Sequence, residues 1–142
     1  MQKLDPNKLF SLFEATDEQV YSENHAEDLL KNPYVLMGMV VRGMENFQLL
    51  HDMYTYKYGE EYKNVVPVVR HRYFRRLYGF LDRITFEDYS HKYMIGKDFD
   101  VKSVYRCLYT LLKYFEQEEE YMKCAKIKKY MDLLATEELY IV

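Results

Sequence analysis

The sequence predicts an all-α fold, a compact bundle of about five to seven helices in a single domain of residues 1–142. Apolar residues recur at steps of three and four along most of the chain, which is the spacing of one helix face. Only 5 glycines and 3 prolines are present, so few turns are available, which favours long helices over many short strands. With 49% hydrophobic and 30% charged residues, the composition is that of a globular domain that needs neither a metal nor a disulfide to hold its core.

Short helices are predicted before residue 32. Asp5 and Pro6 are typical of a helix start, because the aspartate caps the first turn and proline fits its first position. Further helix starts are predicted at Thr16 and Ser22.

Two long helices are predicted for the middle of the chain, over residues 33–58 and about 60–84. Gly59 between them is predicted to end the first helix in the left-handed conformation. Gly43 lies on the apolar stripe of the first helix, where its missing side chain lets another backbone approach closely. That stripe consists of Leu36, Val40, Met44, Phe47, Leu50, Tyr54 and Tyr58.

The two last helices are predicted to follow an irregular stretch over residues 85–99. Asp100 caps the first of them, and the acidic run 116–120 is interpreted as a solvated turn before the second. The residues predicted to face inward are Val101, Val104, Tyr105, Leu108, Leu111, Leu112 and Phe115 in the first helix, and Tyr121, Cys124, Ala125, Ile127, Met131 and Leu134 in the second.

Charge and cysteine content limit the compartment and the partners. The net charge of −3 does not by itself indicate nucleic acid or an anionic membrane as a partner. Cys107 and Cys124 are predicted to be free thiols, with a disulfide between them as the alternative, which indicates the cytoplasm of a bacterium or of a phage-infected host. The chain starts without an apolar signal segment, and its most apolar run, residues 34–41, is too short to cross a membrane.

The strongest functional signal is a ridge of four arginines on the second long helix. At 3.6 residues per turn they share one face, opposite Leu77 and Leu81. Guanidinium groups bind two oxygens at once, so this ridge suits carboxylates or phosphates. The alternative is a solvated face that neutralises neighbouring acidic side chains. The predicted partner-binding residues are Arg72, Arg75, Arg76, Arg83, Tyr73 and Tyr78.

Arg70 lies on the opposite, apolar side of that helix, where a charged side chain needs polar partners. Either Arg70 pairs in the interior, or the helix begins only near Val66, next to Pro67. The late start is the preferred interpretation, because proline fits the first turn of a helix. A kink at Pro67 is the other alternative.

No motif predicts a catalytic residue, a metal ligand or a bound cofactor. The four histidines, His25, His51, His71 and His91, form no metal-binding pair at helical or strand spacing. His51 lies on the apolar stripe and is interpreted as a core histidine with satisfied hydrogen bonds. The calcium loop, the phosphate loop and the nucleophile elbow are all absent from the sequence.

One resemblance concerns residues 116–134. Glu119 to Tyr121 read acidic, acidic and aromatic, and the small pair Cys124-Ala125 precedes an aliphatic and a basic residue. This stretch resembles the core of the UVR-type helical hairpin, a protein–protein docking element of bacterial repair and protease-regulator proteins. The family usually has Arg-Asp where this chain has Lys128-Lys129. The resemblance implies a hairpin that docks or packs, and implies no chemistry.

These observations favour a small non-enzymatic interaction protein, a regulator or assembly factor in the style of bacteriophage accessory proteins. Its expected partner is another protein with an acidic surface, or a second copy of the chain. Nucleic-acid binding through the same ridge is the alternative. An enzyme that assembles a His, Tyr and Glu cluster across helices is a third hypothesis.

Overall fold

The computed structural model describes residues 5–7, 9, 32–85 and 99–141, and these are mostly helical, with no strand among them. They include four long helices: α3 (Pro33–Tyr58), α4 (Glu60–Asp82), α6 (Val101–Gln117) and α7 (Tyr121–Ile141). The all-α prediction is therefore confirmed, whereas five to seven helices are not supported by the described part of the chain. The helix starts predicted at Thr16 and Ser22 and most of the irregular stretch lie outside the described residues.

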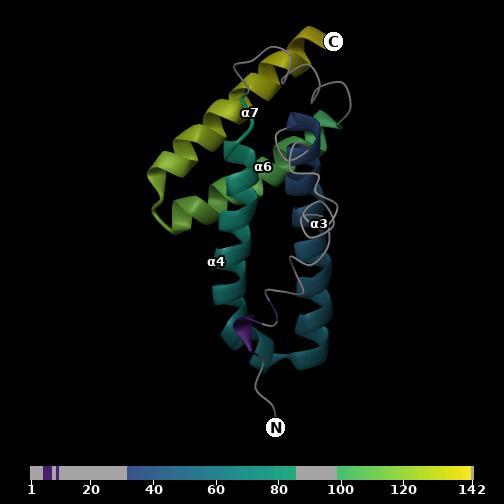
Figure 1. Ribbon diagram of the computed structural model, residues 1–142, viewed down its shortest axis with the longest axis vertical. Coiled ribbons are helices and arrows are strands. Elements are labelled where there is room, and N and C mark those ends of the chain that lie inside the picture. Colours follow the sequence, from purple (N-terminus) through teal and green to yellow (C-terminus); the bar gives the residue numbers. More distant parts are fainter. Residues whose placement is uncertain (1–4, 8, 10–31, 86–98, 142) are drawn as a thin grey trace.

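The four helices form two hairpins. Figure 1 shows α3 and α4 side by side along the long axis of the molecule, with α6 and α7 as a second hairpin next to one part of the first. α3 packs against α4 and α6 against α7, while α6 also packs against α3. The second hairpin thus packs on the first mainly through α6, and side chains of α7 also bond to residues at the end of α4.

The ends of α3 follow the sequence signals. The Asn32 side chain accepts a hydrogen bond from the backbone N–H of Tyr34, at 2.8 Å, and Pro33 occupies the first turn. At the other end, the N–H of Gly59 donates to the carbonyl of Thr55, at 3.0 Å. Gly59 has φ 58° and ψ −123°, so its φ is positive as predicted but its ψ lies outside the left-handed helical region. This conformation is open to glycine and closed to residues with a Cβ.

Helix α4 begins at Glu60, runs through Pro67 and ends at Asp82. The late start near Val66 is therefore wrong, and Arg70 lies three residues beyond a proline inside a continuous helix. Lys63 and Pro67 are both exposed, so water can reach the carbonyl that the proline leaves without a helical partner.

The interface between α3 and α4 is built from aromatic rings. Phe47 is stacked on Tyr73, at 5.5 Å between ring centroids, and meets Phe74 edge-on at 5.0 Å. The Tyr73 hydroxyl donates to the carbonyl of Gly43, at 2.9 Å. A Cβ added at Gly43 would lie 2.6 Å from a methyl carbon of Leu77, so the space at Gly43 is taken by side chains of α4 and not, as predicted, by a backbone.

The interface between α6 and α7 is mainly aliphatic, and it corrects part of the predicted inward set. Tyr105 is 40% exposed and Tyr121 67% exposed, and Ala125 is exposed as well. Tyr130, which the prediction missed, is buried, and its hydroxyl donates to the carbonyl of Ile84 at the end of α4. The fully buried aliphatic residues of this interface are Leu108, Leu111, Ile127 and Leu134.

Both cysteines are free and buried, as predicted. Burial raises the pKa of the Cys107 thiol to about 12, with Glu45 adding to the rise, so this sulfur behaves as an apolar group. Across the described helices, none is both long and apolar enough to cross a membrane.

Candidate functional site

The four ridge arginines all lie on α4, three of them exposed and Arg76 half-buried. Arg72 donates to the side-chain oxygen of Asn7, at 2.6 Å. The guanidinium carbons of Arg76 and Arg83 lie 5.4 Å and 5.8 Å from the centre of the Phe80 ring, so one buried ring supports both cations.

The two tyrosines predicted beside the arginines occupy different places. Tyr73 is only 3% exposed and belongs to the core between α3 and α4, so its side chain cannot reach a partner. Tyr78 is half-buried and meets Phe115 edge-on, at 5.6 Å, with the Lys123 ammonium 5.4 Å above its ring. Burial, and then Asp82, raise the pKa of Tyr78, so its hydroxyl stays neutral at physiological pH.

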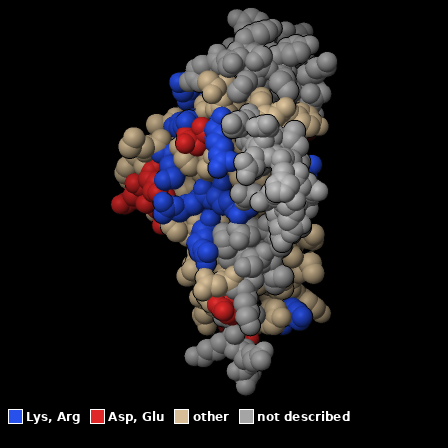
Figure 2. Space-filling view, viewed as in Figure 1, with Lys and Arg blue, Asp and Glu red and all other residues tan. Residues whose placement is uncertain are grey.

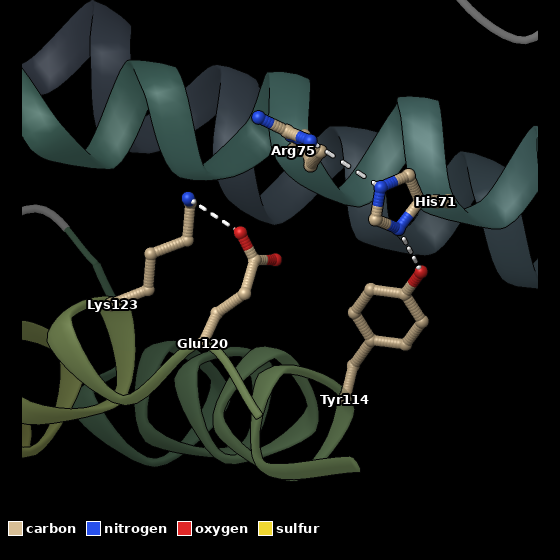
Figure 3. A network of polar contacts seen from close by, with 5 residues as sticks. All are labelled: His71, Arg75, Tyr114, Glu120 and Lys123. Atoms are coloured by element: carbon tan, nitrogen blue, oxygen red, sulfur yellow. Dashed lines mark hydrogen bonds and ion pairs between the residues drawn. The ribbon is translucent and has the colours of Figure 1, made fainter. Parts of the chain in front are cut away.

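Arg75 belongs to a polar network where α4 meets the second hairpin (Figure 3). Arg75 lies 3.4 Å from Nε2 of His71, and Nδ1 of His71 lies 2.8 Å from the Tyr114 hydroxyl oxygen. Because arginine can only donate, Nε2 must accept, and the neutral ring then carries its proton on Nδ1 and donates it to Tyr114. Burial and the nearby Glu118 raise the pKa of Tyr114 to about 12, which keeps its hydroxyl protonated.

Glu120 enters the same region from the turn before α7. Figure 3 shows its carboxylate pointing toward α4, and Lys123 donates to it at 2.9 Å. This hydrogen bond lowers the pKa of Glu120, with further lowering by the charges of Lys123 and Arg75. The second carboxylate oxygen, Oε2, is buried without a hydrogen-bond partner. The prediction of a solvated turn is thus wrong for Glu120, which faces inward.

Helix α7 adds lysines to this face that the sequence reading missed. Lys126 forms an ion pair with Asp82 of α4, and Lys123 lies one turn earlier on α7. Figure 2 shows lysine and arginine side chains gathered in a band across this side of the molecule, with acidic side chains beside it. We define the basic face as Arg72, Arg75, Arg76 and Arg83 of α4 with Lys123 and Lys126 of α7.

Lys123 and Lys126 are three residues apart, which places them on one side of a helix. This spacing is the sequence pattern from which a basic side of α7 can be predicted. Which helix that side would meet depends on how the second hairpin packs, which is not a local property of the sequence.

The exposed cations of the basic face are not all neutralised. Arg75 and Arg83 form no ion pair with a carboxylate among the described residues, although the charge of Arg75 reaches Glu120. Both guanidinium groups therefore keep donors that are open to solvent.

The described histidines are held by tyrosines. Nδ1 of His51 lies 3.0 Å from the Tyr62 hydroxyl, and the His51 ring is stacked on Phe47 at 5.7 Å. His51 is thus half-buried and hydrogen-bonded, close to the predicted core histidine. Burial, and then the charge of Arg70, lower its pKa. Within the described ranges no group of three His, Cys, Asp or Glu side chains is placed to hold a metal ion, and His25 and His91 lie outside those ranges.

Comparison of the chain with protein-family models, with curated proteins and with solved structures finds no match.

Proposed function

We propose that this chain is a non-enzymatic regulatory or assembly protein that docks an acidic segment of a partner protein on its basic face. The observation that carries the proposal is the pair Arg75 and Arg83, two exposed guanidinium groups on one ridge of α4 without a carboxylate in ion-pair range among the described residues. Each has donors arranged to take a carboxylate in a bidentate pair, which fixes orientation as well as adding affinity.

The surroundings of these arginines support a rigid docking surface. Arg83 is held against the Phe80 ring, and Arg75 is held by His71, which is in turn bound to Tyr114. Side chains that are already ordered lose less conformational entropy when a partner binds. The second hairpin supplies Lys123 and Lys126 as the other side of the surface, which agrees with the docking role that the UVR resemblance implies.

The pattern of charges favours carboxylates on a protein over a nucleic-acid backbone. Asp82 and Glu120 lie within the basic face, paired with Lys126 and Lys123. A continuous line of phosphates would pass close to these carboxylates, whereas an acidic peptide can space its charges around them. The net charge of −3 adds a repulsion that a polyanion feels more strongly than a short acidic segment.

The test is affinity capture from cells of the source organism, with quantitative mass spectrometry and a nuclease-treated arm. The bait is compared with the variant Arg75→Glu plus Arg83→Glu. The matched control is Lys57→Glu plus Lys63→Glu, which makes the same change of charge near the Gly59 turn. Along α4, Lys63 is twelve residues from Arg75, or roughly 18 Å.

We expect a partner that survives nuclease treatment, is retained by the control and is reduced at least tenfold by the Arg75/Arg83 variant. A partner retained equally by both variants would contradict the proposal. Material that disappears with nuclease would instead support the nucleic-acid alternative, and capture of the chain's own untagged copy would identify a homo-oligomer. The proposal also places the protein in a reducing compartment, where Cys107 and Cys124 stay as free thiols.

A further inference from the structure

A groove lies where three helices meet, away from the basic face. Its walls come from α3, α4 and the second half of α6, and it has a volume of about 400 Å³. That volume is in the range of sites for small organic ligands. Half-buried Met44 and exposed Pro67 supply apolar surface, whereas Phe47 and Phe74 are almost fully buried, and polar side chains from all three helices line the rest.

Arg70 is the unusual residue of this groove. It is half-buried and lies 5.7 Å from the centre of the Phe47 ring, and it has no hydrogen bond or ion pair with any described residue. A guanidinium group carries five N–H donors, and partial burial restricts the water that can satisfy them. The groove therefore contains a partly desolvated cation whose donors are available.

The charge of the groove restricts its ligand. Arg70 and Lys113 are its cations and Glu118 is its carboxylate, which leaves one net positive charge in the lining when His51 is neutral. Lys113 is in addition paired with Glu116, at 3.4 Å, so Arg70 is the stronger anion partner of the two cations. A monoanion matches this balance, and Glu118 disfavours a doubly charged group such as a phosphate monoester.

We propose that this groove binds a small organic monocarboxylate with an apolar body. Its carboxylate pairs with the Arg70 guanidinium group, and its apolar part packs on Met44 and Pro67. The groove is a second site on another side of α4, because Arg70 lies more than about 100° around this helix from Arg72, Arg76 and Arg83. Tyr114 contacts both sites, since it lines the groove and is bound to His71 beside Arg75.

The experiment is a titration of the full chain with 4-phenylbutyrate, followed by isothermal calorimetry and by amide shifts in two-dimensional NMR. The uncharged 4-phenylbutan-1-ol and the dianion phenyl phosphate are the comparison probes. We expect saturable binding of phenylbutyrate that shifts the amides of Phe47, Arg70 and Thr110. Both comparison probes are expected to bind at least tenfold more weakly. The alcohol lacks the charged hydrogen bond to Arg70, and Glu118 repels the second negative charge of phenyl phosphate.

Variants separate the role of Arg70 from a general effect of charge. Arg70→Gln is expected to weaken phenylbutyrate binding about tenfold or more. Arg106→Gln removes an exposed arginine outside the groove, on α6, and is expected to leave binding within twofold of wild type. Thr110→Tyr fills the groove from an exposed position and is expected to abolish binding, so the proposal stays testable even where Arg70→Gln does not fold.

No saturable binding at ten millimolar ligand, roughly the weakest affinity of a specific small-molecule site, would overturn the proposal. So would equal binding of the alcohol, or undiminished binding by Thr110→Tyr.

Discussion

The turn of each hairpin contains a residue with a positive φ, but the residue type differs between the two turns. Gly59 joins α3 to α4 with φ 58°, and Glu119 has the same φ of 58° between α6 and α7. Glycine adopts a positive φ freely, whereas the Cβ of glutamate makes it unfavourable. The first turn is therefore relaxed and the second strained, and the strained turn is the one that aims Glu120 at α4 beside the basic face.

The side chains inside the two hairpins also differ. The α3–α4 interface is fastened by rings around Phe47 and by the close contact at Gly43. The α6–α7 hairpin has a mainly aliphatic interior, and it meets α4 through aromatic contacts such as Phe115 with Tyr78 as well as through the ion pair of Lys126 with Asp82. Both hairpins are thus well buried, the first by aromatic and the second by mainly aliphatic side chains, and aromatic and polar contacts together join them.

The largest effect is expected from Phe47→Ala. This removes a ring that is 3% exposed and contacts Tyr73, Phe74 and the Arg70 cation, so we expect a loss of about 3–5 kcal/mol in the free energy of unfolding. Urea denaturation measures it. Met53→Ala on the same helix, 54% exposed, is the control and should change stability by less than about 0.5 kcal/mol. A small loss for Phe47→Ala would show that the rings do not fasten the first hairpin.

Gly43→Ala tests the close contact between α3 and α4. The new methyl group would lie 2.6 Å from Leu77 and 3.2 Å from the Tyr73 hydroxyl oxygen, and both neighbours are buried, so we expect a loss of about 1–3 kcal/mol. Gly79→Ala is the control: it adds the same methyl group to α4, where no atom from another part of the chain lies within 4 Å of the new Cβ. It should be neutral, or stabilising by up to about 1 kcal/mol, because alanine has the higher helix propensity. Equal melting temperatures for the two variants would refute the contact.

Substitutions at Gly59 and Glu119 test whether the first turn is relaxed and the second strained. Gly59→Ala places a Cβ at φ 58° and is expected to cost about 1–2 kcal/mol. Glu119→Gly removes the Cβ at a positive φ, and we expect a gain of roughly 0.5 kcal/mol, since the greater freedom of glycine in the unfolded chain offsets part of the relief. Thermal unfolding shifts of the same sign for both variants would contradict the assignment of strain.

The smallest effect is expected from Glu120→Gln, and it depends on pH. The pKa of Glu120 is below its ordinary value of 4.5 in the folded chain, so its ionised form adds stability above about pH 4.5. That contribution, less than about 1 kcal/mol for a partly exposed ion pair, is lost as the pH falls through the lower folded-state pKa. Urea denaturation of both proteins from pH 7 to pH 3 should show curves that converge at the acidic end. A difference in the free energy of unfolding that stays constant from pH 7 to pH 3 would show that the ionised Glu120 does not stabilise the fold.

The sequence predicted much of the fold because its strongest signals are local. Helix α3 has the predicted bounds, since Asn32 and Pro33 mark its start and Gly59 its end. Tyrosine was placed less well, because a side chain with an apolar body and a polar tip fits both sides of an amphipathic helix. Tyr105 and Tyr121 were therefore predicted inside and are exposed, while Tyr130 is buried.

The candidate sites were only partly predictable. The arginine ridge follows from helical spacing on α4, but its lysine side depends on how α7 packs, which no local pattern specifies. Helical spacing alone places Arg70 on the apolar face of α4, but its place in a groove depends on how α3 and α6 pack around it.

The central claim is that Arg75 and Arg83 serve a partner and not the fold, and urea denaturation of the double variant Arg75→Ala plus Arg83→Ala tests it most directly. Exposed contacts of arginine with rings and histidine contribute little, so the free energy of unfolding is predicted to stay within about 1 kcal/mol of wild type. A loss above about 2 kcal/mol would show that these arginines stabilise the hairpins, and it would contradict the proposed function.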